Sequence, residues 1–488
     1  MNDYLALDIG AESGRAIVAT LDGERLTLNE VHRFGNGPVR LPDGIHWDVL
    51  RLWSEIKTGI AAAIKSRAIP ASIGLDTWGV DFALLDKNGA LLGNPFHYRD
   101  ARTDGLVEEA FKRVPRAEIF AQTGIQFMQL NTLYQLFSMS LAKSPLFDVA
   151  ETFVTVPDLF NYWLSGKIAN EFTIATTTQC FNPLTHDWAK GMLETFGIPS
   201  GLFGPLTQPG TILGTLLPEV SEETGAGAIK VVAPACHDTG SAVAAVPAQN
   251  QDFAWISSGT WSIMGAEVRQ PALGEKSLAY NFTNEGGVAG TWRLSKNIMG
   301  LWPVQGCRRY WRAHGEDLSY DEITRLAAEA QPFVAVIDLD ADLFFHPGDM
   351  PEKIRKACAD SGQTLPETKG EIVRVALESL ALKYRLTLEQ VEDLSGKRLD
   401  PIHIIGGGTK NRLLNQFTAD CTGRAVVTGP VEATAIGNVL MQAVALEQLD
   451  SLTEVRDVVR KSFDVESYLP AGRADWDDAY AKLLKLTK

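Results

Sequence analysis

One local pattern occurs twice in this chain, and the repetition limits the folds open to it. In the first copy, Tyr4–Gly10 predicts a buried strand, Ala11–Gly14 a tight turn and Arg15–Leu21 a second strand. In the second copy, about 250 residues later, Phe253–Ser257 predicts a strand that leads through a Gly turn into the strand Ile263–Val268. Two strand–turn–strand units of this kind predict a duplicated fold.

The elements after the first copy predict the class of each half. Arg25–Arg33 alternates as a third strand, Leu50–Ala68 has the period of an amphipathic helix, and Ser72–Asp76 predicts the next strand. A meander followed by a helix and a strand is typical of a ribonuclease-H-like layer. With the repeat, the sequence predicts an α/β protein of two ribonuclease-H-like domains, residues 1–247 and 248–488, with an interdomain cleft.

Asp238 stands almost at the midpoint of the chain, between two predicted elements. The strand Ile229–Ala233 precedes it, and the helix Thr239–Val246 follows it. An Asp at this place either caps the helix or, flanked by His237 and Thr239 in a loop, acts as a general base. The local sequence alone favours the cap, whereas the motifs in the rest of the chain favour the base.

Two further loops place acids beside glycines. Asp8 ends the first predicted strand, where it either starts the turn or, together with the N–H groups of that turn, suits Mg²⁺ and phosphate oxygens. Trp78, Gly79 and Asp81 follow a later strand, and the neighbouring acids and glycine favour a sugar-facing loop over a core aromatic at Trp78. The polar segment His97–Thr103 is either near this loop or a solvated helix start.

Two other stretches bear on binding. Residues 105–200 predict a largely helical insertion, within which the hydroxyl run Glu171–Thr178 predicts a strand or loop that lines the cleft. Later, Ile402–Ile405 predicts a strand that leads through Gly406–Gly408 into the helix Asn411–Cys421. Three glycines at a strand–helix junction let a flat ligand lie on bare backbone, and the helix N-terminus favours phosphate. The alternative is a flexible turn.

Composition and missing motifs exclude several classes of protein. The formal net charge of −15 argues against a nucleic acid or an anionic membrane as a partner. No apolar run approaches the roughly 18 residues that span a bilayer. Five scattered cysteines and an N-terminus without signal-peptide features predict a cytoplasmic protein with reduced thiols. A P-loop, a Rossmann GxGxxG, a His/Cys zinc cluster and a GxSxG elbow are all missing from the sequence.

The full set of motifs resembles the FGGY carbohydrate kinases, which belong to the sugar-kinase, actin and Hsp70 superfamily. The similar blocks follow one another in order from Tyr4 to Leu446, and Thr77–Phe82 and Lys296–Trp302 are the most specific of them. The matching segments are Leu7–Arg15, Ile73–Phe82, Tyr98–Thr103, Thr123–Phe127, Asn131–Leu136, Ala175–Gln179, His237–Thr239, Ser257–Ser262, Asn284–Gly287, Lys296–Trp302 and Gly429–Ala433.

This resemblance implies an enzyme that transfers phosphate from ATP, with Mg²⁺, to a ketose, preferably L-rhamnulose to give L-rhamnulose 1-phosphate. It implies a sugar-binding first domain and an ATP-binding second domain. By matching position Asp238 is the base, and the residues that contact the sugar or lie on its loop are Gly79, His237, Asp238, Thr239, Trp78 and Asp81. Those around the nucleotide are Ala11, Glu12, Ser13, Gly14, Arg15, Thr260, Asn297, Gln305, Gly406, Gly407 and Gly408. Asp8 is expected near Mg²⁺, through water.

One departure and several alternatives accompany the resemblance. Glu12 replaces a small residue of the family pattern, and an acid beside phosphates weakens nucleotide binding unless its side chain turns outward. L-Fuculose, D-xylulose and autoinducer-2 are the alternative substrates within the family. Outside it, an actin/Hsp70-like ATPase switch lacks a reason for the sugar loop, and a non-catalytic sugar sensor lacks a reason for Asp238. A ketose and ATP are the expected partners of a monomer or homodimer.

Overall fold

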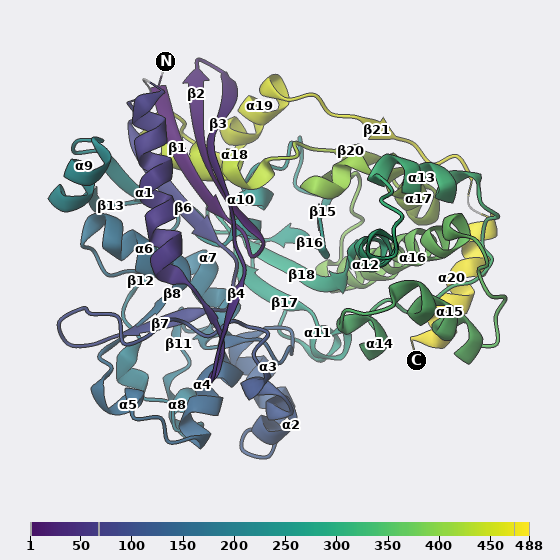
Figure 1. Cartoon of the computed structure of the whole chain (residues 1–488), viewed down its shortest axis with the longest axis horizontal. Helices are drawn as coiled ribbons and strands as arrows, with labels where there is room; N and C mark the ends of the chain where they lie inside the picture. Colours follow the sequence, from purple (N-terminus) through teal and green to yellow (C-terminus); the bar gives the residue numbers. More distant parts are fainter. Residues whose placement is uncertain (1, 67–68, 473, 488) are drawn as a thin grey trace. The chain divides into compact units, whose positions relative to one another are not determined.

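A six-stranded mixed sheet organises the first half of the chain (Figure 1). The computed structural model describes residues 2–66, 69–472 and 474–487. β1 is antiparallel to β2 and parallel to β6, and β6 is parallel to β14. The order is β13-β14-β6-β1-β2-β3, with β1 at Asn2–Ile9, β2 at Ser13–Asp22, β3 at Arg25–Gly35, β6 at Ser72–Thr77, β13 at Thr211–Thr215 and β14 at Lys230–Ala233. The predicted opening meander is therefore confirmed.

A seven-stranded sheet repeats the same neighbour relations. β15 is antiparallel to β16 and parallel to β19, and β19 is parallel to β20. The order is β17-β18-β16-β15-β19-β20-β21, with β15 at Ala254–Ser258, β16 at Trp261–Val268, β17 at Thr283–Gly286, β18 at Trp292–Met299, β19 at Ile402–Ile405, β20 at Val426–Thr428 and β21 at Ser467–Tyr468. This pattern agrees with the predicted duplication, and the α/β class is confirmed.

Four two-stranded sheets complete the β-structure that the described residues contain. The strand Phe82–Leu85 belongs to one of them and pairs with Thr152–Thr155, not with the six-stranded sheet. The pairs are β4 Pro38–Leu41 with β5 Gly44–Trp47, β7 Phe82–Leu85 with β8 Thr152–Thr155, β9 Asn170–Glu171 with β12 Leu206–Thr207, and β10 Phe181–Asn182 with β11 Asp187–Trp188.

Contacts divide the chain into two compact units. Unit 1 comprises Met1–Pro247, Glu267–Leu294 and Ala433–Phe463, and unit 2 comprises Ala248–Ala266, Ser295–Glu432 and Asp464–Lys488. The helices of unit 1 are α1 Val49–Lys65, α2 Leu106–Phe111, α3 Arg116–Thr123, α4 Thr132–Leu141, α5 Leu146–Val149, α6 Val156–Ser165, α7 Phe172–Ala175, α8 Lys190–Thr195, α9 Pro218–Thr224, α10 Asp238–Ala244, α11 Glu275–Tyr280, α18 Ala433–Ala445 and α19 Leu452–Ser462. Those of unit 2 are α12 Trp302–Ala313, α13 Tyr320–Glu329, α14 Asp342–Phe345, α15 Met350–Asp360, α16 Lys369–Ser395, α17 Arg412–Thr422 and α20 Ala474–Leu486. Short 3-10 turns are η1 Ala101–Thr103, η2 Thr176–Thr178, η3 Ser200–Leu202 and η4 Gly407–Lys410.

Helix α1 packs across β1, β2 and β3. Asp48 caps its N-terminus by accepting from the backbone N–H of Arg51 at 3.0 Å. Its buried positions recur at helical spacing and join the apolar core beneath the sheet. The predicted helix Leu50–Ala68 is confirmed up to Lys65, and its last two positions, Arg67 and Ala68, lie outside the described residues.

Helices α10 and α18 pack closely because a glycine lies between them. A Cβ on Gly437 would lie 1.8 Å from the carbonyl oxygen of Ser241. Further along α18, the side-chain amide of Asn438 donates to Asp76 at 2.6 Å, over the bare backbone of Gly74. Helix α18, almost 200 residues downstream, thus packs against the helix that begins at Asp238.

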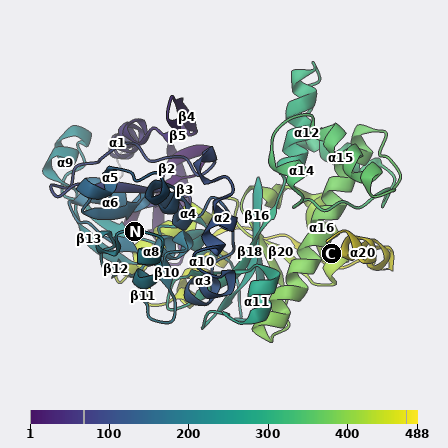
Figure 2. The ribbon, with the colours of Figure 1, turned by 90° about the horizontal axis from the view of Figure 1, so that it is seen from below.

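In unit 2 the long helix α16 packs against α12, α13, α15, α17 and α20. A capping box fixes its start, where Thr368 and Glu371 each bond the other's backbone N–H. Figure 2 shows α16 beside α20, and Arg385 joins them by an ion pair to Asp477 at 2.6 Å. Among the residues described, none of the helices is both long and apolar enough to span a bilayer.

The prediction of a strand or loop at Glu171–Thr178 was wrong from Phe172 on, because Phe172–Thr178 form α7 and η2, whereas Glu171 ends β9. The Glu171 carboxylate caps α7 by accepting from the backbone N–H of Thr173 at 2.9 Å and of Ile174 at 3.2 Å. The hydroxyls of the Thr run then donate to carbonyls three residues back, as Thr177 does to Ile174 at 2.8 Å. These local bonds outweigh the strand preference of β-branched residues.

Candidate active site

The segment before Asp238 continues the pairing with β6 past the end of β14. The backbone N–H of Thr77, the last residue of β6, donates to the carbonyl of Cys236 at 2.9 Å. This places His237 beside the end of β6 and makes Asp238 the first residue of α10. The predicted helix Thr239–Val246 thus begins one residue earlier than expected.

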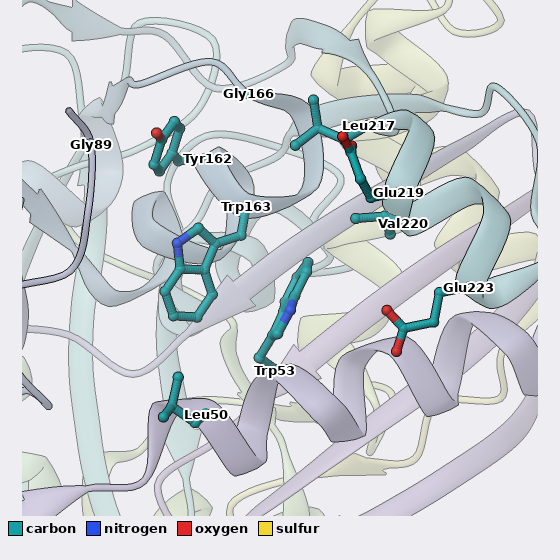
Figure 3. A pocket seen from close by; sticks show the side chains of 10 residues that line it. All are labelled: Leu50, Trp53, Gly89, Tyr162, Trp163, Gly166, Leu217, Glu219, Val220 and Glu223. Carbon is teal, nitrogen blue, oxygen red and sulfur yellow. The ribbon is translucent and has the colours of Figure 1, made fainter.

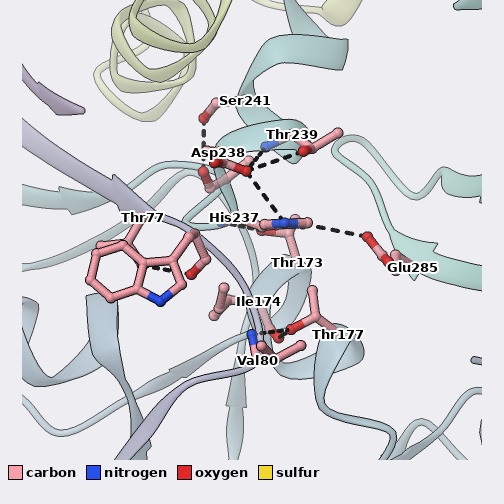
Figure 4. A network of polar contacts seen from close by, with 12 residues as sticks. Thr77, Val80, Thr173, Ile174, Thr177, His237, Asp238, Thr239, Ser241 and Glu285 are labelled. Atoms are coloured by element: carbon pink, nitrogen blue, oxygen red, sulfur yellow. Dashed lines mark hydrogen bonds and ion pairs between the residues drawn. The ribbon is translucent and has the colours of Figure 1, made fainter. Parts of the chain in front are cut away.

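The Asp238 carboxylate is held by one of its two oxygens (Figure 4). Oδ1 accepts from the backbone N–H of Thr239 at 2.5 Å and from its hydroxyl at 3.1 Å. Nε2 of His237 lies 3.3 Å from the same oxygen. Among the described residues no donor contacts Oδ2, and about a third of the side chain is exposed (32%). The carboxylate is therefore fixed in orientation and keeps one oxygen open to a ligand.

His237 is enclosed by a buried ion pair on its other side. Nη2 of Arg293 lies 2.9 Å from Nδ1 of the ring, and Glu285 Oε2 lies 3.0 Å from the same guanidinium nitrogen. Burial alone would raise the pKa of Glu285, but the nearby Arg293 and His237 lower it to about 2. Burial lowers the pKa of Arg293. An ionised Glu285 therefore stands against Arg293 in the interior.

Glu171 also holds the segment before Asp238 in place. Its Oε2 accepts from the backbone N–H of Cys236 at 3.1 Å and from the Thr173 hydroxyl at 2.6 Å. The hydroxyl oxygen of Thr173 in turn accepts from the backbone N–H of His237 at 3.2 Å. Burial raises the pKa of Glu171 to about 7, although four donors oppose the shift. Two consecutive backbone N–H groups before Asp238 are thereby satisfied.

The loop after β6 brings Gly79 against His237. A Cβ on Gly79 would lie 3.2 Å from Nε2 of His237 and 3.3 Å from the Thr177 hydroxyl. The next residue, Val80, has a positive φ of 69°. Its N–H donates to Thr177 at 3.2 Å and its carbonyl accepts from Thr132 at 2.5 Å. Side chains on both flanks thus hold a strained backbone in place.

Trp78 and Asp81 lie behind this loop, inside unit 1. Asp81 is 1% exposed and accepts from the indole N–H of Trp47 at 2.6 Å, from that of Trp78 at 2.9 Å and from Gln135 at 2.9 Å. The Trp78 ring packs on Trp47 with centroids 4.0 Å apart. Burial raises the pKa of Asp81 to about 6, and its donors limit the rise. Both side chains fix the loop that carries Gly79.

Asp8 lies at the end of β1 beside two other charged groups. One oxygen accepts from Arg15 at 2.8 Å, directly across the β1–β2 pair. On the other side it stands in register with Asp76 of β6. Burial, and then the charge of Asp8, raise the pKa of Asp76 well above its usual range. Within the part of the chain that the structure describes, no cluster of three His, Cys, Asp or Glu side chains is suited to a metal.

The turn between β1 and β2 is closed by its backbone. The N–H of Gly10 donates to the carbonyl of Ser13 at 2.9 Å, with Ala11 half-buried between them. The side chain of Glu12 is exposed. A Cβ on Gly14 would lie 2.2 Å from the Phe34 ring, so glycine is required there by packing.

In unit 2 the Gly run and the second turn form a group of their own. The Thr260 hydroxyl donates to Gln305 Oε1 at 3.0 Å. Gly408 lies on Ser258, whose hydroxyl a Cβ would approach to 2.0 Å, whereas a Cβ on Gly407 meets nothing within 4 Å. Gly406 has a positive φ of 84°. Asn297 lies on β18.

Comparisons with known proteins decide the family. The chain matches the N-terminal domain of the FGGY family of carbohydrate kinases over residues 3–245 and its C-terminal domain over residues 254–446. The chain belongs to the FGGY family of carbohydrate kinases. The predicted resemblance is therefore confirmed.

Curated relatives of this FGGY kinase match it over nearly its full length. It is 44% identical to a protein named rhamnulokinase from Bacteroides thetaiotaomicron, with 98% of each chain covered. It is 41% identical to a protein of the same name from Oceanobacillus iheyensis, with 95% of this chain and 97% of the relative covered.

Solved structures show the same fold at low identity. A ligand-bound xylulose kinase from Lactobacillus acidophilus superposes with a TM-score of 0.82 at 16% identity, covering 100% of this chain and 96% of that one. A Plasmodium falciparum glycerol kinase with ADP superposes with a TM-score of 0.82 at 17% identity, covering 100% and 98%. The predicted sugar-kinase fold is thereby confirmed.

The structure adds residues to the candidate site that the sequence motifs did not single out by role. Gln135 bonds Asp81, Thr177 holds the Gly79 loop, and Arg293 and Glu285 enclose His237. The sequence carried one signal for Arg293, a charged residue within the otherwise apolar Trp292–Leu294.

A surface pocket of unit 1 contains none of the predicted site residues (Figure 3). It has a volume of about 550 Å³ and lies among α1, α6 and α9. Trp53 and Trp163 meet in it edge to face, with centroids 5.5 Å apart. It is separate from the group around Asp238.

Proposed function

We propose that this FGGY kinase transfers the γ-phosphoryl group of ATP to L-rhamnulose, giving L-rhamnulose 1-phosphate in the breakdown of L-rhamnose. The observation that carries the proposal is the Asp238 carboxylate, held through Oδ1 and open at Oδ2, beside His237 and Gly79. The name rhamnulokinase, which the similar proteins carry, supports the choice of ketose.

In this proposal the sugar binds to residues 1–247. Oδ2 of Asp238 aligns the acceptor hydroxyl and takes its proton as the O–P bond forms. His237, Thr239 and the backbone at Gly79 contact the rest of the sugar. Trp78 and Asp81 act through the loop that they hold.

The nucleotide is assigned mainly to residues 248–488. The backbone at Gly407 leaves space for the nucleotide, because a Cβ built there meets no atom of the described residues within 4 Å. The remaining proposed contacts are Thr260, Asn297, Gln305, Gly406 and Gly408 in that half, and Ala11, Glu12, Ser13, Gly14 and Arg15 in the turn after β1. Phosphoryl transfer has a loose transition state, so positioning and neutralised charge supply most of the rate.

We further propose Mg²⁺ near Asp8. Carboxylate oxygens are the hard ligands that Mg²⁺ prefers, and this ion usually keeps several waters. Arg15 already occupies one oxygen of Asp8, which favours contact through water. When bound, the ion neutralises charge on the phosphate oxygens.

A substrate screen tests the proposal. Phosphorylation rates are measured with ATP and L-rhamnulose, L-fuculose or D-xylulose, and the product is identified by phosphorus NMR. The expected result is the highest kcat/KM with L-rhamnulose and phosphate on its primary hydroxyl. A higher kcat/KM with another ketose overturns the choice of sugar. ATP turnover that no ketose changes favours an ATPase switch instead.

We also propose a cytoplasmic monomer or homodimer that works without nucleic acid or membrane. The net charge of −15 supports the last point. The five cysteines are buried, separate thiols, which fits a reducing compartment. Light scattering of the purified protein measures the oligomeric state.

A further inference from the structure

Arg293 is buried in β18 and bonds directly to the ring of His237. The residue has no exposed surface. Its Nε donates to the carbonyl of Gly286 at 2.9 Å, and its Nη2 lies 2.9 Å from Nδ1 of His237. Glu285 Oε2 lies 3.0 Å from the same Nη2 and 3.4 Å from the same Nδ1. The guanidinium is thus fixed at a carbonyl, a carboxylate and an imidazole nitrogen.

This contact determines where the imidazole carries its proton. A guanidinium has donors and no acceptor, so a nitrogen that bonds to it has to offer a lone pair. A neutral His237 with its lone pair on Nδ1 carries its hydrogen on Nε2. The opposite tautomer would set an N–H of the ring against an N–H of Arg293 and leave only the longer contact to Glu285.

The tautomer decides whether His237 attracts or repels the base. Nε2 lies 3.3 Å from Oδ1 of Asp238 (Figure 4). With a hydrogen on Nε2 this contact is attractive and adds a third group to Oδ1, after the N–H and hydroxyl of Thr239. With a lone pair there, two electron-rich atoms would face each other and the carboxylate would turn.

We propose that Arg293 is a positioning residue that holds His237 as the Nε2–H tautomer and thereby keeps Oδ2 of Asp238 directed at the acceptor hydroxyl. This inference rests on the proposed function for the identity of the acceptor. Glu285 is the counter-charge that orients Arg293. Without Arg293, the same Glu285 would attract the ring proton to Nδ1 and reverse the tautomer.

The first test reads the ring directly in the wild-type protein. Long-range proton–nitrogen correlation spectra of protein labelled with ¹⁵N-histidine distinguish the two tautomers and the doubly protonated ring. The His237 signal is the one absent from His237→Gln. The expected result near neutral pH is a hydrogen on Nε2 only. A hydrogen on Nδ1, alone or together with Nε2, overturns the inference.

The second test is a double-mutant cycle on kcat with ATP and L-rhamnulose. Arg293→Met is expected to lower kcat about 10- to 100-fold, the range of a hydrogen bond to a charged group. In the His237→Gln background the same change is expected to cost less than about twofold, because a glutamine amide has no tautomer to control. An equal loss in both backgrounds overturns the inference.

A matched control and a second variant keep this test interpretable. Arg456 is also buried in unit 1, at 6% exposed, but pairs with Glu267 at 2.9 Å, so Arg456→Met reports the cost of losing a buried arginine away from His237. Should Arg293→Met fail to fold, the pair Arg293→Met with Glu285→Gln leaves no buried charge unpaired. Because it removes both the donor to Nδ1 and the carboxylate that would attract the ring proton, the hydrogen is expected to divide between the two ring nitrogens, and kcat to fall by less than the 10- to 100-fold expected of Arg293→Met while KM for the ketose changes little. A ring protonated on Nε2 only, with wild-type kcat, overturns the inference.

The two proposals fail in different ways. If the wild-type protein phosphorylates none of the ketoses, the proposed function is overturned, and the histidine spectrum alone decides the state of His237. If L-rhamnulose is phosphorylated but the ring carries its hydrogen on Nδ1, the function stands and the role of Arg293 is overturned.

Discussion

The hairpins β1–β2 and β15–β16 have the same backbone plan and different chemistry. In each hairpin a glycine follows the first strand in the turn. That first strand pairs with its antiparallel hairpin partner on one side and with a parallel strand on the other. Asp8 faces Arg15 across its hairpin and Asp76 across the parallel pair. The corresponding residue of the second hairpin, Ser257, faces Ile263 and Ile405.

The comparison indicates that the side chains at the ends of these strands can differ while the backbone plan stays the same. Backbone hydrogen bonds close both turns, from Gly10 to Ser13 and from Gly259 to Trp261, each at 2.9 Å. The fold therefore depends little on the side chains at the ends of the strands. Unit 1 has charge at that position and unit 2 has a hydroxyl and, nearby, the bare backbone of Gly406–Gly408. Unit 1 should thus be sensitive to loss of charge, and unit 2 to added bulk.

The largest effect is expected from Asp238→Asn, which removes a charge and keeps the shape. The acceptor hydroxyl loses its proton acceptor, so kcat should fall about 10²- to 10⁴-fold. Steady-state kinetics measures the fall, and calorimetry should show that L-rhamnulose still binds. Turnover close to that of the wild type would remove Asp238 from the mechanism.

The next effect compares the two hairpins directly. Asp8→Asn should lower kcat/KM for ATP about 10- to 100-fold and raise the Mg²⁺ concentration that gives half-maximal rate, the size typical of partners that act on a metal through water. Ser257→Ala, the equivalent change in the second hairpin, should cost less than about threefold. Equal losses in the two variants would contradict the assignment of charge to unit 1. Thermal unfolding of both serves as the folding control.

Added bulk tests unit 2. Gly407→Val should raise KM for ATP about tenfold, the cost of overpacking a fitted contact, and leave KM for the ketose unchanged. A Cβ there meets no protein atom within 4 Å, so the fold should be kept, whereas Gly408→Ala should destabilise the protein because Ser258 occupies the space. Gly93→Val, at another open glycine, is the control. An unchanged KM for ATP would mean that the glycine run is only a turn.

The smallest effect is expected at Glu12, the departure from the family pattern. Its side chain is exposed, and a solvated charge is largely screened at physiological salt. Glu12→Ala should therefore change KM for ATP by less than about twofold. A tenfold fall in KM would show that the carboxylate repels the phosphates and that the first turn is less open than its exposure indicates.

The sequence by itself determined many of the elements and the family. The opening meander, the second hairpin, the strand Ile402–Ile405 and the segment around Asp238 were predictable because each is a local pattern of apolar residues, glycines and turn residues. Several element ends shifted by one residue, as α10 did, because capping depends on individual hydrogen bonds. Family motifs supplied the candidate site residues.

Only the tertiary structure decided how those residues are held. Nothing local to Asp81 indicated that Trp47 and Gln135 would saturate its carboxylate. Arg293 reaches His237 across 56 residues of sequence, and Asn438 reaches Asp76 across 362. Side-chain partners this distant are brought together by strand order and helix packing, which a pattern read along the chain does not contain. The sequence therefore determined which groups are available, and the fold decided their hydrogen-bond partners and the directions of their pKa shifts.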